Sequence, residues 1–154
     1  MKTESKLMKR FNLRVYGVLI NENHEILISK ETYRGLSFTK FPGGGLCLGE
    51  SLPDGLIREF KEECNLDIKV EKLLHVTDTL VPSVFDDSQV IGVYYKVRAL
   101  NSNLSDDFKV ENYDEQNDSF QLFQWIPTRK LTAEDFYFDM DQEAWRQIIR
   151  VSKI

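Results

Sequence analysis

Most of the chain alternates between apolar and polar positions in the manner of β-strands. Residues 11–20 (FNLRVYGVLI) are rich in β-branched and aromatic side chains, and we expect a buried strand there. The polar turn at 21–24 leads into residues 25–29 (EILIS), which should return as the second strand of a hairpin. Residues 31–40 are expected to form a loop. Further strands are predicted at 66–80, 88–100 and 119–127, and a polar, acidic stretch occupies 101–118.

Two segments have the spacing of helices. Ser51 is a suitable N-cap, with Pro53 in the first turn and Asp54 three residues on, so a helix is predicted to begin there. Its core-facing stripe is formed by Leu56, Ile57, Phe60 and Cys64. A second helix is predicted from Met140 to about Val151. One face of it carries Met140, Ala144, Ile148 and Val151, flanked by Trp145 and Ile149.

The strands outnumber the helices, which favours an α+β fold with a mixed sheet and helices packed on its faces. The chain has 154 residues, of which 42% are hydrophobic, enough to bury a substantial core. It shows no internal repeat, low-complexity tract or Pro/Gly/Ser linker. We therefore expect a single domain over residues 1–154.

Charge and composition exclude several classes of function. The formal net charge is −5 and the pI about 5.1, which argues against a general nucleic-acid binder but not against a small phosphate ligand. No apolar run reaches the ~20 residues of a membrane helix, and the N-terminus has no apolar stretch of signal-peptide length. Cys47 and Cys64 lack CxxC spacing, so reduced thiols in a cytoplasmic protein are expected. The sequence leaves a homodimer open.

The chain has only two histidines, His24 and His75, which makes a histidine-rich zinc site or a Ser–His–Asp triad improbable. Any catalytic residues are therefore expected to be carboxylates. Glu59, Glu62 and Glu63 lie together on the first helix, at i, i+3 and i+4. Like charges at this spacing destabilise a helix. A solvated acidic face, relieved by Arg58 and Lys61, is one interpretation.

The flanking residues favour a second interpretation. Three glycines at 43–45 deliver the chain into this helix, and Glu50 stands just before the N-cap. Mg²⁺ prefers oxygen ligands and is commonly paired with substrate phosphates. Clustered carboxylates and an exposed carbonyl in a glycine turn therefore indicate a metal-assisted enzyme acting on phosphates.

The segment 44–66 resembles the Nudix box, G-x5-E-x7-R-E-U-x-E-E-x-G-U, where U is a bulky apolar residue. The matching positions are Gly44, Glu50, Arg58, Glu59, Phe60, Glu62, Glu63 and Leu66. Asn65 stands where the family has glycine. That position is expected to end the helix in the left-handed region, where asparagine is tolerated next after glycine. The FPGGG lead-in and Trp125-Ile126-Pro127 also look like family features.

Similarity to the Nudix hydrolases, a MutT-like family, implies an α/β/α sandwich around a mixed sheet, with the box as a loop–helix–loop. It implies hydrolysis of a nucleoside diphosphate linked to another moiety, by water attack on phosphorus with Mg²⁺ or Mn²⁺. Carried over, Glu59, Glu62 and Glu63 would hold the metal with the Gly44 carbonyl, and Arg58 would orient Glu59. Glu50 would be structural. Glu59 is the expected general base, with Glu111, Glu115 and Asp118 as alternatives from a later loop.

The substrate is specified less well. Lys30, Arg34 and Lys40 are candidate phosphate ligands, although each could be a solvated surface cation. Tyr33, Phe38 and Phe85 could stack on a base or simply pack. Pro82 lies sixteen residues after Leu66, as in the ADP-ribose-hydrolysing branch that this chain resembles, which favours ADP-ribose or a nucleotide sugar. The alternatives are a nucleoside triphosphate pyrophosphohydrolase of the MutT type, a non-catalytic ligand-binding module, or an isomerase.

Overall fold

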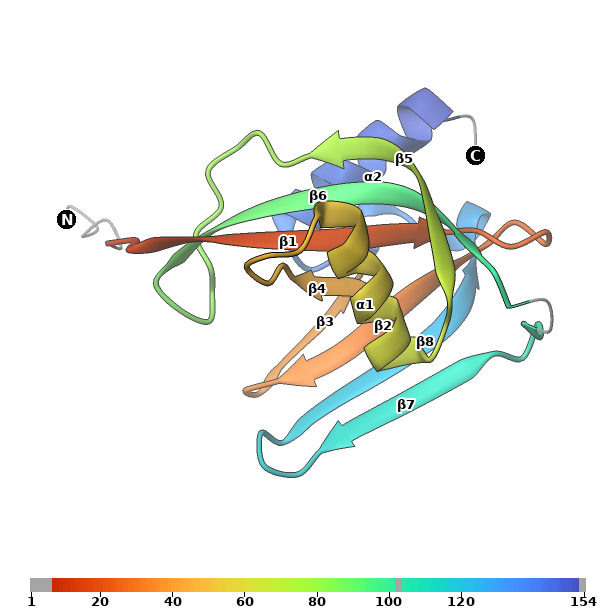
Figure 1. Cartoon of the computed structure of the whole chain (residues 1–154), viewed down its shortest axis with the longest axis horizontal. Coiled ribbons are helices and arrows are strands. Elements are labelled where there is room, and N and C mark those ends of the chain that lie inside the picture. Colours follow the sequence, from red (N-terminus) through yellow and green to blue (C-terminus); the bar gives the residue numbers. More distant parts are fainter. Residues whose placement is uncertain (1–6, 102–103, 153–154) are drawn as a thin grey trace.

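The computed structural model describes residues 7–101 and 104–152, and its strands form two four-stranded sheets (Figure 1). The first sheet has the order β4-β1-β6-β5, in which β1 and β6 are parallel and the other pairs antiparallel. The second has the order β3-β2-β8-β7 and is antiparallel throughout. The first sheet comprises β1 (Arg10–Leu19), β4 (Gly43–Gly45), β5 (Ile68–Val76) and β6 (Ser88–Ala99). The second comprises β2 (Glu25–Tyr33), β3 (Leu36–Lys40), β7 (Lys109–Asp114) and β8 (Ser119–Pro127).

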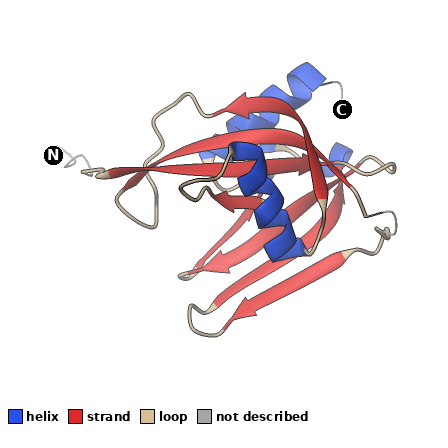
Figure 2. Ribbon diagram, in the orientation of Figure 1, coloured by secondary structure: helices blue, strands red, loops and turns tan. Residues whose placement is uncertain are grey.

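Two helices lie on opposite sides of the strands, α1 (Leu52–Cys64) in front and α2 (Asp139–Ser152) behind (Figures 1 and 2). Two short 3-10 turns, Thr128–Lys130 and Ala133–Asp135, connect β8 to α2. The predicted α/β/α arrangement around mixed strands is confirmed. Within the described part of the chain, neither helix is long and apolar enough to span a bilayer.

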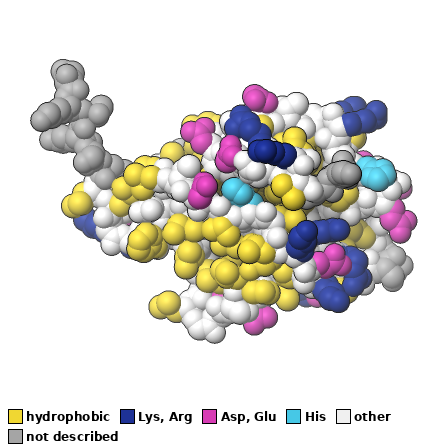
Figure 3. Space-filling model, turned by 90° about the horizontal axis from the view of Figure 1, so that it is seen from above, with side chains coloured by type: hydrophobic (Ala, Val, Ile, Leu, Met, Phe, Trp, Pro, Cys, Tyr) yellow, Lys and Arg dark blue, Asp and Glu magenta, His cyan; other side chains and the backbone are white. Residues whose placement is uncertain are grey.

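Each helix covers its own hydrophobic core. Leu56, Phe60 and Cys64 of α1 pack with residues from both sheets, including Val15 and Phe123. On the other side, α2 buries Met140, Ala144, Trp145 and Ile148 against residues such as Tyr16 and Ile28. Residues 15 and 16 of β1 therefore point into different cores, as alternation along a strand requires. Seen from above, hydrophobic side chains gather over one part of the surface and lysines and arginines mainly over another (Figure 3).

The first predicted hairpin is only partly correct. Ile20 and Ile26 form a single antiparallel bridge, but β1 and β2 then diverge into different sheets. The expected loop at 31–40 is wrong, because β2 continues to Tyr33 and pairs with β3 across a two-residue turn. That turn is formed by Arg34 and Gly35, which have φ values of 49° and 77°, a backbone form that suits tight hairpins.

Three further differences concern the edges of the elements. The acidic stretch at 101–118 contains β7, which pairs along β8, and the strand predicted at 66–80 is shorter and carries irregularities in register. Ile57 and Val151 were placed on buried helix faces, yet they are 38% and 73% exposed. Ile57 lies at the margin of the apolar face of α1, whereas Val151 lies in the last turn of α2, which ends at Ser152.

Candidate active site

Strand β4 is confined between β1 and α1, and its glycines make that possible. A Cβ atom on Gly43 would lie 2.0 Å from the backbone oxygen of Val15, at a φ of 149°. A Cβ atom on Gly44 would lie 2.5 Å from the carboxylate carbon of Glu59. No side chain fits at either position. The three glycines, expected as a turn, thus form a short strand that brings the backbone of residue 44 directly against the Glu59 carboxylate.

Arg58 organises the carboxylates around it. Its Nε and Nη2 donate to the two oxygens of Glu50 at 3.0 and 2.7 Å, and Nη2 also donates to the carbonyl of Gly45 at 3.0 Å. Its Nη1 donates to Glu59 at 3.0 Å and to Glu62 at 3.2 Å. The hydrogen bonds from Arg58 lower the pKa of Glu50 to about 2. Arg58 thus contacts Glu59 while Glu50 anchors Arg58, and an orienting role for Arg58 stays a prediction.

Glu63 faces the interior between α1 and the second sheet. Burial, chiefly, raises the pKa of its carboxyl to about 7, and the nearby carboxylates of Glu59 and Glu31 add to the rise. Gln121 of β8 donates from the same amide nitrogen to Glu63 at 3.3 Å and to Glu31 at 2.9 Å. Asn112 of β7 donates to the backbone carbonyl of Glu63 at 2.9 Å. Two strands of the second sheet therefore fix the C-terminal end of α1.

A cavity of about 440 Å³ is lined by Glu31 and by Gln121, the residue that bonds to both Glu31 and Glu63. Its polar lining also includes Arg14, Lys40 and Asn112. Its apolar lining includes Tyr33, Phe38, Phe85 and Phe138, whose rings contact one another at centroid distances of 5.1–6.3 Å. The aromatic residues singled out in the sequence, Tyr33, Phe38 and Phe85, therefore both contact other rings and line the cavity. Pro82 also lines the cavity.

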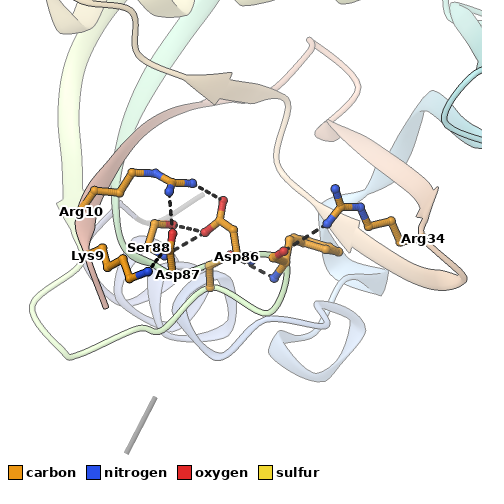
Figure 4. A network of polar contacts seen from close by, with 8 residues as sticks. Lys9, Arg10, Arg34, Asp86, Asp87 and Ser88 are labelled. Atoms are coloured by element: carbon orange, nitrogen blue, oxygen red, sulfur yellow. Dashed lines mark hydrogen bonds and ion pairs between the residues drawn. The ribbon is translucent and has the colours of Figure 1, made fainter. Parts of the chain in front are cut away.

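The wall that carries Pro82 and Phe85 is a loop between β5 and β6, and two arginines hold it (Figure 4). Arg10 of β1 pairs with Asp86, at 2.9 Å, and with Asp87. Arg34 donates to the backbone carbonyl of Phe85 at 3.1 Å. Arg34, predicted as a phosphate ligand, thus contacts this loop.

The other predicted phosphate ligands lie in different surroundings. Lys30 is exposed on β2 and is not part of the cavity lining. Lys40 is buried and lies in the cavity, where its Nζ is 3.0 Å from Glu31. Burial lowers the pKa of Lys40, but the carboxylate of Glu31, together with smaller contributions from Tyr16 and Glu63, raises it, and the pKa lies above its ordinary value. The charge of Lys40 is therefore already balanced by Glu31.

The alternative bases lie on or next to β7. Glu111 is exposed on β7 and pairs with Lys109 at 3.2 Å. Glu115 and Asp118 are exposed in the turn between β7 and β8, and Asp118 accepts a hydrogen bond from the Tyr113 hydroxyl at 3.3 Å. The structure brings Arg58, Glu59 and Glu62 together, with Gly44 beside them. The alternative bases Glu111, Glu115 and Asp118 are exposed to solvent.

The donor atoms fit a hard divalent cation. Arg58 bonds to one oxygen each of Glu59 and Glu62, and Gln121 to one oxygen of Glu63, which leaves a second carboxylate oxygen on each. Carboxylate and carbonyl oxygens are the ligands that Mg²⁺ prefers. Among the described residues, no group of three or more Asp, Glu, His or Cys side chains is already gathered around one point. A metal-binding role for Glu59, Glu62, Glu63 and Gly44 stays a prediction.

Several residues of the site were not found from the sequence. Arg14, Glu31, Asn112 and Gln121 come from β1, β2, β7 and β8, far from the box in sequence. The only sequence signal for them is polarity at alternate positions of otherwise apolar strands, which is common on solvated sheet faces. Their role depends on strand pairing that no local motif specifies.

Residues 10–146 match the NUDIX domain family model. Nudix hydrolase 2 of Arabidopsis thaliana is 36% identical over 64 residues, which are 40% of this chain and 23% of that protein, so the match spans less than a quarter of this relative. The MutT protein of Methanosarcina mazei Go1 has the same fold, with a TM-score of 0.71 and 18% identity over 96% of this chain and 99% of that one. An ADP-ribose pyrophosphatase from Streptococcus suis 89-1591 gives a TM-score of 0.58 and 16% identity, covering 93% and 92%. The sequence resemblance is thus confirmed over most of the chain, which belongs to the NUDIX domain family.

Proposed function

We propose that this protein is a metal-dependent Nudix pyrophosphohydrolase that cleaves a nucleoside diphosphate linked to another moiety. The observation that carries the proposal is the contact between Gly44 and Glu59, with Arg58 bound to Glu59 and Glu62. Arg14, which lines the cavity, lies opposite the neighbouring Gly45. Nudix hydrolases typically use a divalent metal, and the free carboxylate oxygens here supply suitable ligands. The cavity supplies room for the organic part of the substrate.

The residues of the chain have separable tasks in this reaction. When bound, Mg²⁺ or Mn²⁺ would neutralise the diphosphate and lower the pKa of the attacking water. Glu59, Glu62, Glu63 and the Gly44 carbonyl would hold the metal, and Glu59 would take the proton from the water. Arg58 holds Glu59 in place through a charge-assisted hydrogen bond rather than touching the substrate.

Within this class we favour ADP-ribose or another nucleotide sugar as substrate. Support comes from Pro82, which lies in the cavity wall, and from the contacting rings of Tyr33, Phe38, Phe85 and Phe138, which offer apolar faces to a base. A nucleoside triphosphate is the alternative. Two unpaired cysteines, Cys47 and Cys64, support a cytoplasmic location.

The test is a panel of nucleoside triphosphates, ADP-ribose and nucleotide sugars, assayed for phosphate-containing products with Mg²⁺, with Mn²⁺ and with excess chelator. We expect turnover of a diphosphate-linked substrate with either metal and none with chelator. Full turnover in chelator would contradict the metal mechanism. Preferred cleavage of triphosphates would replace the nucleotide-sugar proposal by the MutT-type alternative, and binding without any cleavage would indicate a ligand-binding module.

A further inference from the structure

Arg14 lies between the cavity, which it lines, and the region of Glu59 on α1. It lies on β1 opposite Gly45 of β4, next to the contact between Gly44 and Glu59, and its side chain lines the cavity. Its Nε donates to the Tyr16 hydroxyl at 2.7 Å. Among the residues that the structure describes, neither Nη1 nor Nη2 has a hydrogen-bond or ion-pair partner.

A guanidinium in this position is incompletely satisfied. It carries five N–H donors and stays charged at any ordinary pH, yet only one of its donors is used. Tyr16 chiefly raises the pKa of Arg14, and the carboxylates of Glu59 and Glu31 add to the rise, but neither carboxylate forms an ion pair with Arg14 among the described residues. Partly buried charges are normally paired, because desolvating an unpaired charge is costly. The free edge of this guanidinium is therefore suited to an anionic ligand that enters the cavity.

The other cations near the site are already engaged. Lys40, the other cation in the cavity lining, is paired with Glu31, and Arg58 is bound by three carboxylates. Arg34 contacts the loop that forms the cavity wall. Arg14 is thus the cation of the described cavity lining that keeps donors for a ligand.

We propose that Arg14 binds a phosphate oxygen of the substrate diphosphate, on the side of the phosphates that faces the cavity. The inference rests on the proposed function, because it assumes a diphosphate lying between the cavity and Glu59. A planar fork of two N–H groups matches a phosphate in bidentate geometry. The hydrogen bond from Nε to Tyr16 fixes the orientation of this fork before the substrate arrives.

Binding of non-hydrolysable diphosphates tests this assignment without turnover. The probes are the α,β-methylene diphosphates of adenosine, guanosine, cytidine and uridine, titrated calorimetrically with Mg²⁺, alongside the four parent nucleosides. For the diphosphates that the wild type binds, Arg14→Gln should weaken affinity at least about tenfold and leave nucleoside affinity unchanged, as expected for a lost charge-assisted contact. Arg14→Lys, which keeps the charge but not the fork, should lie between. Arg98→Gln is the matched control, since Arg98 pairs with Glu71 on the surface, and should bind within about twofold of wild type.

Each outcome separates this inference from the proposed function. Unchanged diphosphate affinity in a folded Arg14→Gln variant, or an equal loss for nucleoside and diphosphate, overturns the role of Arg14 even if the wild type hydrolyses its substrate. Arg14-dependent binding without any hydrolysis in the panel supports the inference and refutes the enzyme. Failure of the wild type to bind any of the four diphosphates overturns the inference. If Arg14→Gln does not fold, the diphosphate affinity of Arg14→Lys takes its place: a loss of affinity supports the role of Arg14, and an unchanged affinity overturns it.

Discussion

Glu59 lies where only glycine at residue 44 permits it, and the contact makes the position of this carboxylate a property of the backbone. One of its oxygens accepts from Arg58, and the side chain is only 12% exposed. A carboxylate held in this way needs little reorganisation during a reaction, which is the condition under which charged groups contribute most to catalysis. Its removal should therefore affect turnover more than folding.

We expect Glu59→Gln to lower kcat by at least about 10², the usual range for a lost base or a lost metal-positioning group. The amide keeps the shape of the side chain and removes one of three mutually repelling charges, so the melting temperature should not fall. The measurement is steady-state kinetics with the best substrate of the panel, with Glu71→Gln as a surface control that keeps the wild-type kcat. A near-normal kcat in folded Glu59→Gln would move the base to Glu115 or Asp118, and replacing each in turn would identify it.

The box residues could be predicted because their relation is local. Fixed spacing along a helix places Arg58, Glu59 and Glu62 on one side of α1, and the structure joins them through hydrogen bonds. The sequence does not show in the same way which of Lys40 and Arg14 is available to bind a phosphate. Whether a cation is free depends on partners such as Glu31, which only the pairing of β2 with β3 brings near Lys40.

At the scale of elements, α1 begins and ends as its sequence predicts. The Ser51 side chain accepts from the Asp54 backbone at 3.2 Å, and Asn65 has the left-handed values φ 53° and ψ 33°. The backbone N–H of Asn65 donates to Lys61, and that of Leu66 to Phe60, at 3.1 and 3.3 Å. These bonds satisfy carbonyls at the end of the helix. The departure from glycine at residue 65 thus leaves the termination intact.

Asn65→Gly should be neutral or raise the free energy of unfolding by up to about 1 kcal/mol, because glycine enters the left-handed region freely. The gain is partly offset by the larger unfolded-state entropy of glycine. Asn65→Val should be clearly destabilising, since a β-branched residue is strained at positive φ. Chemical denaturation measures both. Lost activity in Asn65→Gly at unchanged stability would contradict a purely conformational role for this exposed asparagine.

Two of the strands that the sequence did not predict share one property. Both β3 and β7 have few fully buried positions, so neither shows the strong apolar alternation that marks β1 or β6. Their pairing with β2 and β8 is decided by neighbours that are distant or turn-dependent. Sequence patterns therefore predict the covered centre of this fold better than its edges.

At the scale of the whole molecule, α2 is attached to the strands through a buried polar contact as well as through its core. The Tyr94 hydroxyl of β6 donates to Oδ1 of Asp141 at 2.6 Å, while Oδ2 of Asp141 is buried without a hydrogen-bond partner among the described residues. Burial raises the pKa of Asp141 to about 6, although Tyr94, Lys40 and Arg14 act against the rise. Folding thus makes this carboxyl easier to protonate than it is in the unfolded chain.

Because the folded pKa lies above the value of 3.8 for an unfolded aspartate, Asp141 should lower the free energy of unfolding progressively as pH rises from about 4 to 6. Asp141→Asn keeps the acceptor for Tyr94 and removes the charge. An unpaired amide is less costly to bury than an unpaired carboxylate. The variant should therefore melt above the wild type at pH 8, with a difference that shrinks towards pH 4.

Thermal unfolding across this pH range provides the measurement, with Asp107→Asn, at an exposed position, as the matched control. A difference between Asp141→Asn and wild type that does not depend on pH would show that the charge of Asp141 carries no penalty.

The two arginines that hold the loop between β5 and β6 have a consequence for the thermodynamics of ligand binding. Arg10 and Arg34 tie residues 85–87 to β1 and to the turn between β2 and β3. A cavity wall fixed in this way loses little conformational freedom when a ligand arrives, so less of the interaction energy is spent on ordering the protein. The same rigidity limits the ability of the wall to adapt to a larger ligand. We therefore expect the size of the ligands that bind here to be limited by the folded protein itself.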